Sequence, residues 1–451
     1  MIINEKEIDK ILKEPSKEPA EKIIEKALEL KGLSLEETAK LLLSDETEKI
    51  FLAARAIKER IYGKRIVLFA PLYSTNECSN NCLYCAFRKD NKGLKRKSLS
   101  LDEIRQEVEA IEDEGHKRIL LVAGEDPRSA GIENLGKIIK VIYETKKGKG
   151  EIRRVNVNVA PMEIDDFKRL KRTGIGTYQL FQETYHQETY KTCHPTGQKA
   201  NYEYRLTAMD RALKAGLKDV GIGALFGLYD HKFEVLALLS HARHLDQKYK
   251  IGPHTISVPR IEPADNAPLA AAPPAPVSDQ DFKKLVAVLR MAVPYTGIIL
   301  STRENAKMRD ELISLGVSQI SAGSRTNPGG YSENTSGGQF ELFDTRPTLQ
   351  VIKDILKLGQ IPSFCTACYR LGRCGEDFMD LAKPGEINKF CLPNALLTFK
   401  EYLLDYGDNE VKIMGGKVIL EQVQGIADTP RKEATLKRLK ELESGKRDLY
   451  F

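Results

Sequence analysis

Residues 65–85 read RIVLFAPLYSTNECSNNCLYC, an apolar run that is followed closely by three cysteines. The run is typical of a buried strand, and Cys78, Cys82 and Cys85 then stand in the spacing C-x3-C-x2-C. A 4Fe–4S cluster needs a ligand on each iron, so three thiolates leave one iron open to a small molecule. The spacing predicts such a cluster. A structural zinc site is the alternative, but it wants four ligands, and no fourth Cys or His lies nearby in sequence.

Seven further apolar runs follow, and helical patterns separate them. Eight strand–helix units over about 270 residues predict an α/β fold, a (β/α)8 TIM-type barrel whose chemistry gathers at the carboxyl ends of the strands. An open doubly wound sheet is the second interpretation. The predicted strands begin at Arg65, Arg118, Arg154, Thr177, Asp219, His254, Gly297 and Val317.

The barrel is predicted to occupy residues 64–345, between an N-terminal helical segment (1–63) and a mainly helical C-terminal extension (346–451). Ser34 and Glu37 form a capping-box pattern in the N-terminal segment. Residues 263–278 (PADNAPLAAAPPAPVS) are too long for a plain connection, and we expect a lid, a channel wall or an unstructured insertion. Pro393 suits the first position of a helix that continues to about Tyr406.

Composition excludes several classes of protein. Of the 451 residues, 41% are hydrophobic and 30% charged, as in ordinary globular proteins. The net charge of +6 is small for this length, so we expect no nucleic-acid partner. No apolar run is long enough to span a bilayer, and the first residues lack a secretory signal. We expect a cytoplasmic protein, in which the eight cysteines indicate metal sites rather than disulfides.

A second set, Cys365, Cys368 and Cys391, has the spacing C-x2-C-x22-C. A helix after the eighth strand runs antiparallel to the barrel strands, so this set is expected at the opposite end from Cys78, on the order of 20 Å away. His254 opens the sixth strand and should face the same end. Cys374 is either a bystander or the fourth ligand of a structural zinc site formed with this set.

The first cysteine motif resembles that of the radical S-adenosylmethionine (SAM) superfamily. The resemblance implies that Tyr84 lies beside the adenine of SAM, and that the backbone of Gly124 and Glu125, at the end of the second strand, meets the amino group of SAM. The stretches FQETYH (181–186), CHPTG (193–197) and Tyr204-Arg205 resemble the branch that cleaves aromatic amino acids between Cα and Cβ. This second resemblance implies that Glu183 contacts SAM and that Arg205 binds the SAM carboxylate. Cys193 has no metal-ligand spacing and is predicted to be structural.

An amino-acid substrate brings a carboxylate of its own, which needs a partner in the barrel. The candidates that the family comparison supports are Arg303, after the seventh strand, and Ser321 and Ser324 at the eighth. A guanidinium group pairs well with a carboxylate, and Arg260, at the end of the sixth strand, is a competing choice for the same reason.

The second cysteine set is similar to that of the HydG family, the tyrosine lyases of FeFe-hydrogenase maturation. The resemblance implies cleavage of L-tyrosine to p-cresol and dehydroglycine, and conversion of dehydroglycine to CO and cyanide ligands. It implies two iron–sulfur clusters: a SAM-binding 4Fe–4S cluster, and an auxiliary 4Fe–4S cluster with an extra iron held by His254.

The same resemblance implies two protein partners, a ferredoxin- or flavodoxin-like electron donor and a hydrogenase maturation scaffold protein. Two alternative functions remain open. One is a 2-iminoacetate synthase of the thiamine pathway, a sister family that lacks the second cysteine set. The other is a non-enzymatic iron–sulfur carrier.

Overall fold

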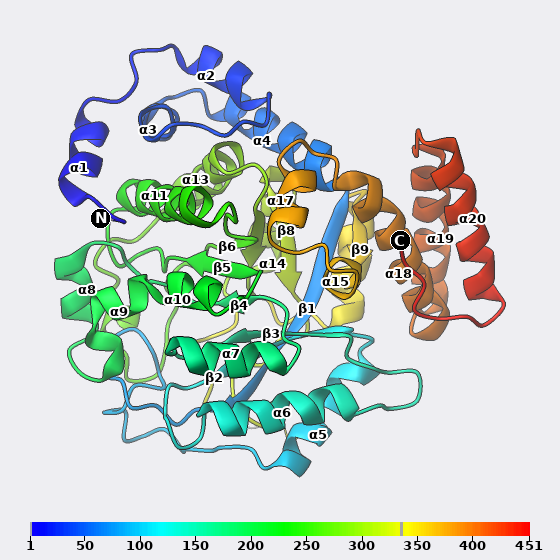
Figure 1. Cartoon of the computed structure of the whole chain (residues 1–451), viewed down its shortest axis with the longest axis horizontal. Helices are drawn as coiled ribbons and strands as arrows, with labels where there is room; N and C mark the ends of the chain where they lie inside the picture. Colours follow the sequence, from blue (N-terminus) through cyan, green and yellow to red (C-terminus); the bar gives the residue numbers. More distant parts are fainter. Residues whose placement is uncertain (1, 334–336) are drawn as a thin grey trace.

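The computed structural model describes residues 2–333 and 337–451. Met1 and residues 334–336, which the predicted N-terminal segment and barrel include, lie outside it. Eight parallel strands form a closed barrel, because the first strand pairs with both the second and the eighth (Figure 1). The predicted (β/α)8 barrel is confirmed, and the open doubly wound sheet is wrong. The barrel strands are β1 (Arg65–Thr75), β2 (Arg118–Ala123), β3 (Arg154–Asn158), β4 (Tyr178–Gln179), β5 (Val220–Gly223), β6 (Thr255–Ser257), β7 (Gly297–Leu300) and β8 (Val317–Ser321).

Strand β1 is eleven residues long and pairs with three strands. Residues Val67 to Phe69 pair with β8, and the residues from Ala70 onward pair with β2. A ninth strand, β9 (Ile361–Ser363), which the sequence analysis did not predict, pairs with the first residues of β1. Strand β9 lies beside β1 on the side opposite β8. Further along β1, strand β2 occupies that same side. The chain that follows β9 therefore leaves from the amino end of the barrel strands.

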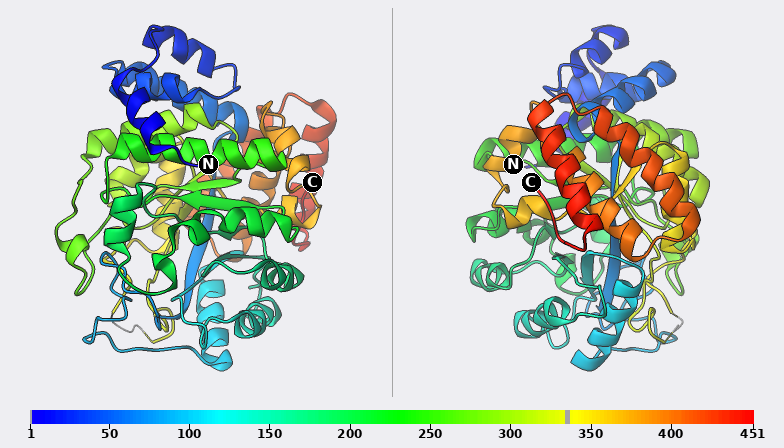
Figure 2. Two further views of the ribbon diagram at one scale, coloured as in Figure 1. Left: turned by 60° about the vertical axis from the view of Figure 1, so that its left-hand side comes forward. Right: turned by 90° about the vertical axis from the view of Figure 1, so that its right-hand side faces the viewer.

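Helices surround the barrel and extend from it at both ends of the chain (Figure 2). The segment before β1 is helical, as predicted, and α4 packs against α13 on the barrel wall. These N-terminal helices are α1 (Glu5–Lys13), α2 (Ala20–Ala27), α3 (Leu35–Leu43), whose predicted capping box of Ser34 and Glu37 is present, and α4 (Thr47–Tyr62). The helices between barrel strands are α5 (Leu101–Asp113), α6 (Ile132–Glu144), α7 (Ile164–Arg172), α8 (Gln187–Cys193), α9 (Tyr202–Leu206), α10 (Ala208–Lys214), α11 (His231–Tyr249), α12 (Pro268–Ala271), α13 (Asp279–Ala292) and α14 (Ala306–Leu315), with a 3-10 turn at Gln198–Ala200.

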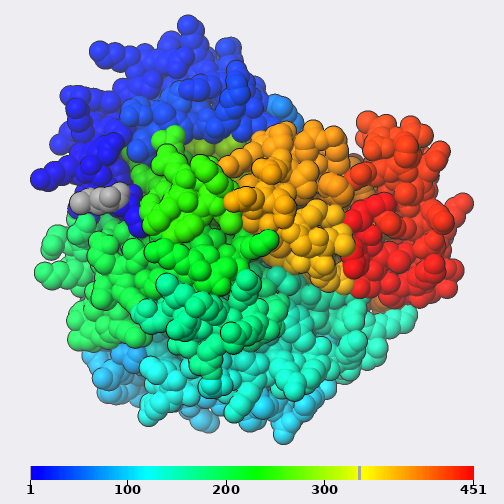
Figure 3. All heavy atoms as spheres, in the orientation of Figure 1, coloured from blue at the N-terminus to red at the C-terminus, as the bar shows by residue number. Residues whose placement is uncertain are grey.

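The C-terminal extension is mainly helical, as predicted, and in the space-filling view its last helices stand out from one side of the barrel (Figure 3). Helix α18 packs against β9 and carries α19 and α20 on its other side. The helices of the extension are α15 (Thr348–Lys357), α16 (Ala367–Arg370), α17 (Glu376–Ala382), α18 (Asn388–Asp405), α19 (Asn409–Gln424) and α20 (Thr429–Glu443). Among the described residues, no helix has the length and apolar character needed to cross a membrane.

Helix α18 begins at Asn388, five residues before Pro393, so the prediction that Pro393 opens the helix is wrong. A proline inside a helix provides no N–H for the carbonyl four residues earlier, which here is that of Lys389. Arg431 in α20 supplies the missing donor, because its Nη1 donates to the Lys389 oxygen at 2.7 Å. The tertiary contact lets the helix extend backward and include Cys391.

We expect Arg431→Met to lower the free energy of unfolding by about 1 kcal/mol, the usual net value of a hydrogen bond. In a Pro393→Ala background the restored N–H serves the Lys389 carbonyl, so the same substitution should matter less than half as much. Urea unfolding of the four proteins measures this coupling, and the stacking of Arg431 on Phe390 cancels in the comparison. Lys432→Met, which loses only an exposed contact with Gln424, is the control. Equal losses in both backgrounds would contradict the explanation.

Candidate functional site

An open cavity with about 1320 Å³ of empty space lies at the carboxyl ends of the barrel strands. Its lining comes from the loop after β1 and from the ends of nearly all the other strands, so residues far apart in sequence meet here. We call it the upper cavity. The predicted SAM- and substrate-site residues that line it are Cys78, Cys82, Cys85, Tyr84, Gly124, Glu125, Glu183, Arg205, Arg303 and Ser321.

The three upper thiols are buried or half-buried. Burial raises the pKa of Cys82 to about 12, and that of Cys78 and Cys85 to about 11. A thiol in such a setting becomes a thiolate only beside a positive partner, which a metal centre provides. Within the described ranges, no three His, Cys, Asp or Glu side chains stand close enough together to hold a single ion. Three thiols spread around one cavity fit a cluster of several irons, which needs thiolate ligands on separate irons.

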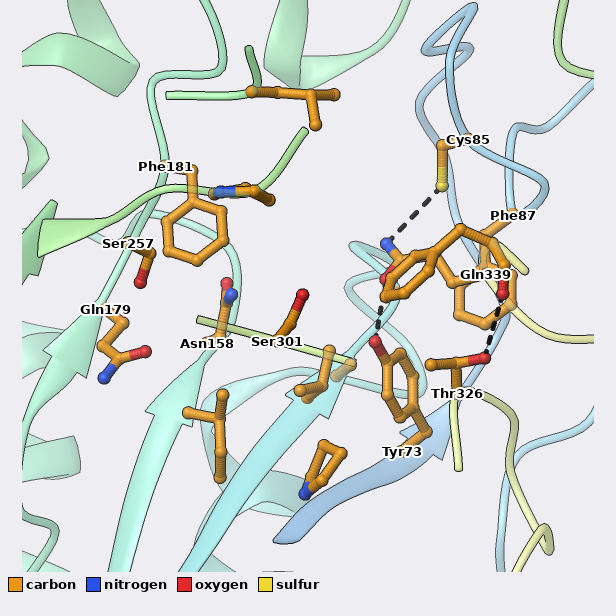
Figure 4. A pocket seen from close by; sticks show the side chains of 18 of the residues that line it. Tyr73, Cys85, Phe87, Asn158, Gln179, Phe181, Ser257, Ser301, Thr326 and Gln339 are labelled. Carbon is orange, nitrogen blue, oxygen red and sulfur yellow. Dashed lines mark hydrogen bonds between the residues drawn. The ribbon is translucent and has the colours of Figure 1, made fainter. Parts of the chain in front are cut away.

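Gln339, from the segment after β8, contacts the cysteine loop directly (Figure 4). Its Nε2 donates to Cys85 Sγ at 3.6 Å, and its Oε1 accepts from the Tyr73 hydroxyl at 2.9 Å. Its backbone oxygen accepts from Ala86 N at 3.2 Å. Hydrogen bonds to cluster sulfurs tune the reduction potential. The sequence analysis missed Gln339, because no spacing motif links it to the cysteines.

The end of β2 lies directly against the backbone of the cysteine loop. Gly124 is required at this position, because a Cβ there would lie 2.2 Å from the carbonyl oxygen of Glu77. The next carbonyl, that of Glu125, accepts hydrogen bonds from Ser79 N (3.0 Å) and Ser79 Oγ (2.7 Å). The backbone that was expected to meet the amino group of SAM is therefore also the anchor of the cysteine loop.

The loop at residues 263–278, for which an unstructured insertion was one expectation, is ordered and packs on the cysteine loop. It contains α12, whose Leu269 N donates to the Leu83 carbonyl at 3.0 Å. Ala267 and Ala270 are buried in the same apolar cluster as Cys82. The segment forms a wall behind the first cysteine site.

Two carboxylates and two cations form a buried network on one side of the upper cavity. Arg205 Nη1 donates to Glu125 at 3.0 Å, and Lys199 Nζ donates to Glu183 at 2.6 Å. Burial alone would raise the pKa of Glu125, but Arg205 and Lys199 outweigh burial and hold it below its ordinary value. Glu183 has a φ of 71°, a strained left-handed conformation that is often found at functional positions. Lys199 was not predicted, since it belongs to no recognised motif.

The Tyr84 ring is held in place by His194. Nδ1 of His194 donates to the Tyr190 carbonyl at 2.7 Å, which leaves Nε2 to accept the Tyr84 hydroxyl at 2.7 Å. Burial lowers the pKa of His194 and keeps the ring neutral. Cys193 is buried in the apolar cluster of Cys82 and Tyr84, where it packs as a small core residue.

Arg303 and Arg260 have different surroundings. Arg303 lines the cavity and stacks on Phe340 (3.3 Å to the ring centroid), and no carboxylate of residues 2–333 or 337–451 forms an ion pair with it. Arg260 is bound to Glu304 and Asp279, each through an N–H at 2.8 Å, and lies outside the cavity lining. Of the two arginines, Arg303 is the one whose guanidinium is free to donate hydrogen bonds to an incoming carboxylate.

Several polar side chains face the barrel interior below the cysteines. Asn158, Gln179, Ser257 and Ser301 point into the cavity from the strand ends (Figure 4). Ser321 Oγ is buried and has no partner among the described residues; the same is true of Ser324 Oγ, which does not line the cavity. A polar interior with free hydrogen-bonding capacity differs from the usual packed core of such a barrel and suits a polar ligand.

A second cavity, which we call the lower cavity, has about 440 Å³ of empty space and lies at the opposite end of the barrel. In Figures 1 and 2 the orange segment that includes α17 lies at the far end of the barrel from the light-blue loop after β1. Cys365, Cys368, Cys391 and His254 all line this cavity. The sequence analysis predicted this end of the barrel for all four residues. Along β1, Arg65 lines the lower cavity and Tyr73 lines the upper one, and these two residues lie roughly 25 Å apart.

His254 is oriented by a carboxylate. Its Nδ1 lies 3.5 Å from Asp219 Oδ2, and the described residues provide no hydrogen bond to Nε2. Burial lowers the pKa of His254, which favours the neutral ring. A neutral imidazole whose second nitrogen faces a carboxylate is the usual arrangement of a metal-binding histidine.

Cys374 lies near the lower cysteines but not in the cavity lining. Its Sγ donates to the Cys368 carbonyl at 3.9 Å, so it contacts the backbone of this loop. The donors of the lower set are not grouped around one point in the described structure. The three thiols and His254, which line one cavity, fit an auxiliary cluster that has one iron without a cysteine.

Only a short stretch of barrel separates the two cavities. On β1, Val67 lines the lower cavity and Phe69 the upper, while on β8 Gln319 lines the lower and Ser321 the upper. Residues two apart on a strand face the same side, about 7 Å from each other. The nearest lining residues of the two cavities are therefore only two positions apart on the same strand.

Residues 72–240 match the radical SAM superfamily, and residues 257–361 match the biotin and thiamin synthesis associated domain. A crystal structure of HydG, a maturase of the FeFe-hydrogenase, is 53% identical, covers 100% of both chains and superposes with a TM-score of 0.96. This chain belongs to the HydG family of radical SAM enzymes. Membership implies a 4Fe–4S cluster and SAM, for which the upper cavity has fitting residues.

Two further relatives define the position of the chain within its superfamily. The HydG structure from Carboxydothermus hydrogenoformans is 44% identical over 96% of each chain, with a TM-score of 0.84. The 2-iminoacetate synthase of Escherichia coli K12 is 30% identical over 78% of this chain and 92% of its own length. The resemblance to HydG is confirmed, and the sister family is more distant. The lower cysteines lie beyond both matched domains, and the HydG structure that covers 100% of this chain includes them.

We expect Gly124→Ala to displace the cysteine loop and prevent assembly of the upper cluster, so that total iron falls by about half if both clusters assemble in the parent protein. Iron and sulfide analysis after anaerobic reconstitution measures the loss. Gly136→Ala is the matched control, because its Cβ would meet nothing closer than Thr173 Cγ2 at 3.8 Å. Full iron content in Gly124→Ala would mean that the loop does not need its contact with β2.

Proposed function

We propose that the protein is a radical SAM L-tyrosine lyase that cleaves the Cα–Cβ bond to give p-cresol and dehydroglycine. It then converts dehydroglycine to CO and cyanide ligands for assembly of the FeFe-hydrogenase active site. The observation that carries the proposal is the second cavity, in which three cysteines and His254 meet in a chain that matches HydG over its full length. Both residue sets on one chain support two linked reactions.

When bound, a SAM-ligated 4Fe–4S cluster supplies a 5′-deoxyadenosyl radical, and an auxiliary cluster with an extra iron supplies a site for CO and cyanide. Cys78, Cys82 and Cys85 would hold the first cluster, and Gln339 would donate to one of its thiolates. The residues assigned to SAM are Tyr84, Gly124, Glu125, Glu183 and Arg205. The charge network supports this role, because a zwitterionic amino-acid group needs both carboxylates and cations at hydrogen-bonding distance.

In the proposed substrate complex, Arg303 binds the tyrosine carboxylate and Ser321 adds a hydroxyl. The support is that Arg303 is half-buried and has no carboxylate partner in the described structure, and that the buried Ser321 Oγ is likewise unpaired there. A partly desolvated guanidinium without a counter-charge pairs favourably with an incoming carboxylate. Arg260 already has two carboxylate partners and is left out of the site.

At the lower end, Cys365, Cys368 and Cys391 would hold the auxiliary cluster, and His254 would hold the extra iron with Asp219 behind it. The small imine would pass between the cavities through the polar barrel interior. Two protein partners are part of the proposal: a ferredoxin- or flavodoxin-like electron donor, and a scaffold protein that receives the product.

A second candidate is a 2-iminoacetate synthase that releases its product from the upper cavity. The relative from Escherichia coli favours it, since that enzyme spans most of this chain. Trapping of CO by deoxyhaemoglobin during tyrosine turnover separates the two functions, because only the dual-site enzyme makes CO. Tyrosine-dependent release of 5′-deoxyadenosine would exclude an iron–sulfur carrier.

We expect Cys82→Ala to abolish SAM cleavage, because the first cluster loses one of its three thiolates. His254→Ala should keep p-cresol formation within about twofold and reduce CO at least tenfold, a loss typical of a removed metal ligand or its orienting partner. Chromatography of p-cresol and the deoxyhaemoglobin assay measure the two products. Equal loss of p-cresol in both variants would contradict the division between an upper and a lower site.

Arg303→Met should raise the KM for L-tyrosine about 30-fold, corresponding to roughly 2 kcal/mol for a lost charge-assisted contact with the carboxylate. The affinity for SAM should stay unchanged, since Arg303 does not belong to the charge network. Arg260→Lys is the matched control, because it keeps a cation beside Glu304, and its KM should stay within twofold. The assignment of the two arginines would be reversed if Arg260→Lys had the larger effect.

A further inference from the structure

Two arginines line the lower cavity and have no role in the function described above. Arg65 opens β1 and Arg118 opens β2, and both side chains line the cavity with the cysteines. The two residues are 9% and 5% exposed. The Nε–H of each is buried and finds no hydrogen-bond partner in the part of the chain that the structure describes.

Neither guanidinium group has a carboxylate partner within the described residues. Arg118 Nη2 donates to the Cys365 carbonyl at 2.6 Å and its guanidinium lies over Tyr369, while that of Arg65 lies over Tyr62. These contacts orient the two side chains but do not neutralise them. A buried charge without a counter-charge is unfavourable, so the cavity should contain anions when it functions.

The auxiliary cluster accounts for only part of that negative charge. Three thiolates exceed the charge of an oxidised 4Fe–4S core by one unit, which balances one of the two arginines. The nearby carboxylate of Asp219 faces His254. The extra iron proposed on His254 would add positive charge of its own, so the cavity keeps an excess of positive charge that suits a further anion.

Thr366 completes the set of donors. Thr366 lines the same cavity, and its hydroxyl is buried and unpaired among the described residues. Two guanidinium N–H groups and one hydroxyl match the oxygens of a carboxylate. His254 lines the same cavity, so a small acid bound here would lie beside the proposed extra iron.

We propose that Arg65, Arg118 and Thr366 form a carboxylate-binding site for the small two-carbon acid that arrives from the upper cavity. The inference rests on the proposed function, because that acid is dehydroglycine. The site would hold its carboxylate beside the iron on His254 and keep it from escaping. Dehydroglycine that escapes reacts with water, which replaces the C=N group with C=O and gives glyoxylate and ammonia.

The test compares Arg118→Gln and Arg65→Gln with Arg154→Gln. Arg154 is a matched control, because it opens β3 and also stacks on Tyr369, at 4.1 Å, but lies outside the cavity lining. Its Nη atoms donate to the carbonyls of Gly174 and Ile175 instead. In Arg118→Gln and Arg65→Gln, p-cresol should stay within twofold, CO should fall at least tenfold, and glyoxylate should rise to match the lost CO. Arg154→Gln should resemble the parent protein in all three products.

A binding measurement tests the site without turnover. Glyoxylate is added to the reduced holoenzyme with L-tyrosine present and SAM omitted, and the EPR signal of the auxiliary cluster is followed. Glyoxylate should shift this signal in the parent protein and in Arg154→Gln, and at least tenfold more should be needed in Arg118→Gln and Arg65→Gln.

Two results would overturn the proposal: equal glyoxylate responses in all four proteins, including no response in any, or loss of the auxiliary cluster's iron in both cavity variants. The second would mean that the arginines serve the cluster alone. A parent protein that makes p-cresol without CO would refute the proposed function, and the glyoxylate titration would still decide whether the carboxylate site exists.

Discussion

The pairing of β1 with three strands is the constraint on which both cavities depend. Its last residues pair with β2 and deliver the first cysteine loop to the carboxyl end of the barrel. Its first residues pair with β9, which delivers the second cysteine set to the amino end. Because a strand in a barrel is a rigid element buried on both faces, the two sites are held at a constant separation along one axis.

The electrostatics of the two ends differ in a way that follows their chemistry. At the upper end, Glu125 and Glu183 pair with Arg205 and Lys199 before any ligand arrives, so the network suits a zwitterion that exchanges one set of ion pairs for another. At the lower end, Arg65 and Arg118 have no carboxylate partner in the described chain, so the cavity suits a net anion. A buried charge is favourable only when an opposite charge compensates it. The upper cavity is therefore suited to a ligand with both charges, and the lower cavity to a ligand with net negative charge.

The residues between the cavities explain how one barrel can serve both ends. Barrels of this type usually fill their interior with branched apolar side chains. Here the inward positions include Asn158, Gln179, Ser257 and Gln319, with Gly221 and Gly297 where a side chain would collide with Thr255 or Gln319. A polar and partly open interior is less well packed than an apolar one, while the eleven residues of β1 are all buried.

The sequence by itself determined the strand order, the barrel, both cysteine sets and His254, because these depend on local periodicity and on motif spacing. It did not reveal β9, the start of α18, Gln339, Lys199 or the arginines at the lower end. Those features arise only when distant segments meet: Arg431 supplies the donor that Pro393 lacks, and Gln339 reaches Cys85 across more than half of the chain. A choice such as Arg303 over Arg260 also needed the tertiary structure, since only the folded chain decides which cation already has a carboxylate beside it.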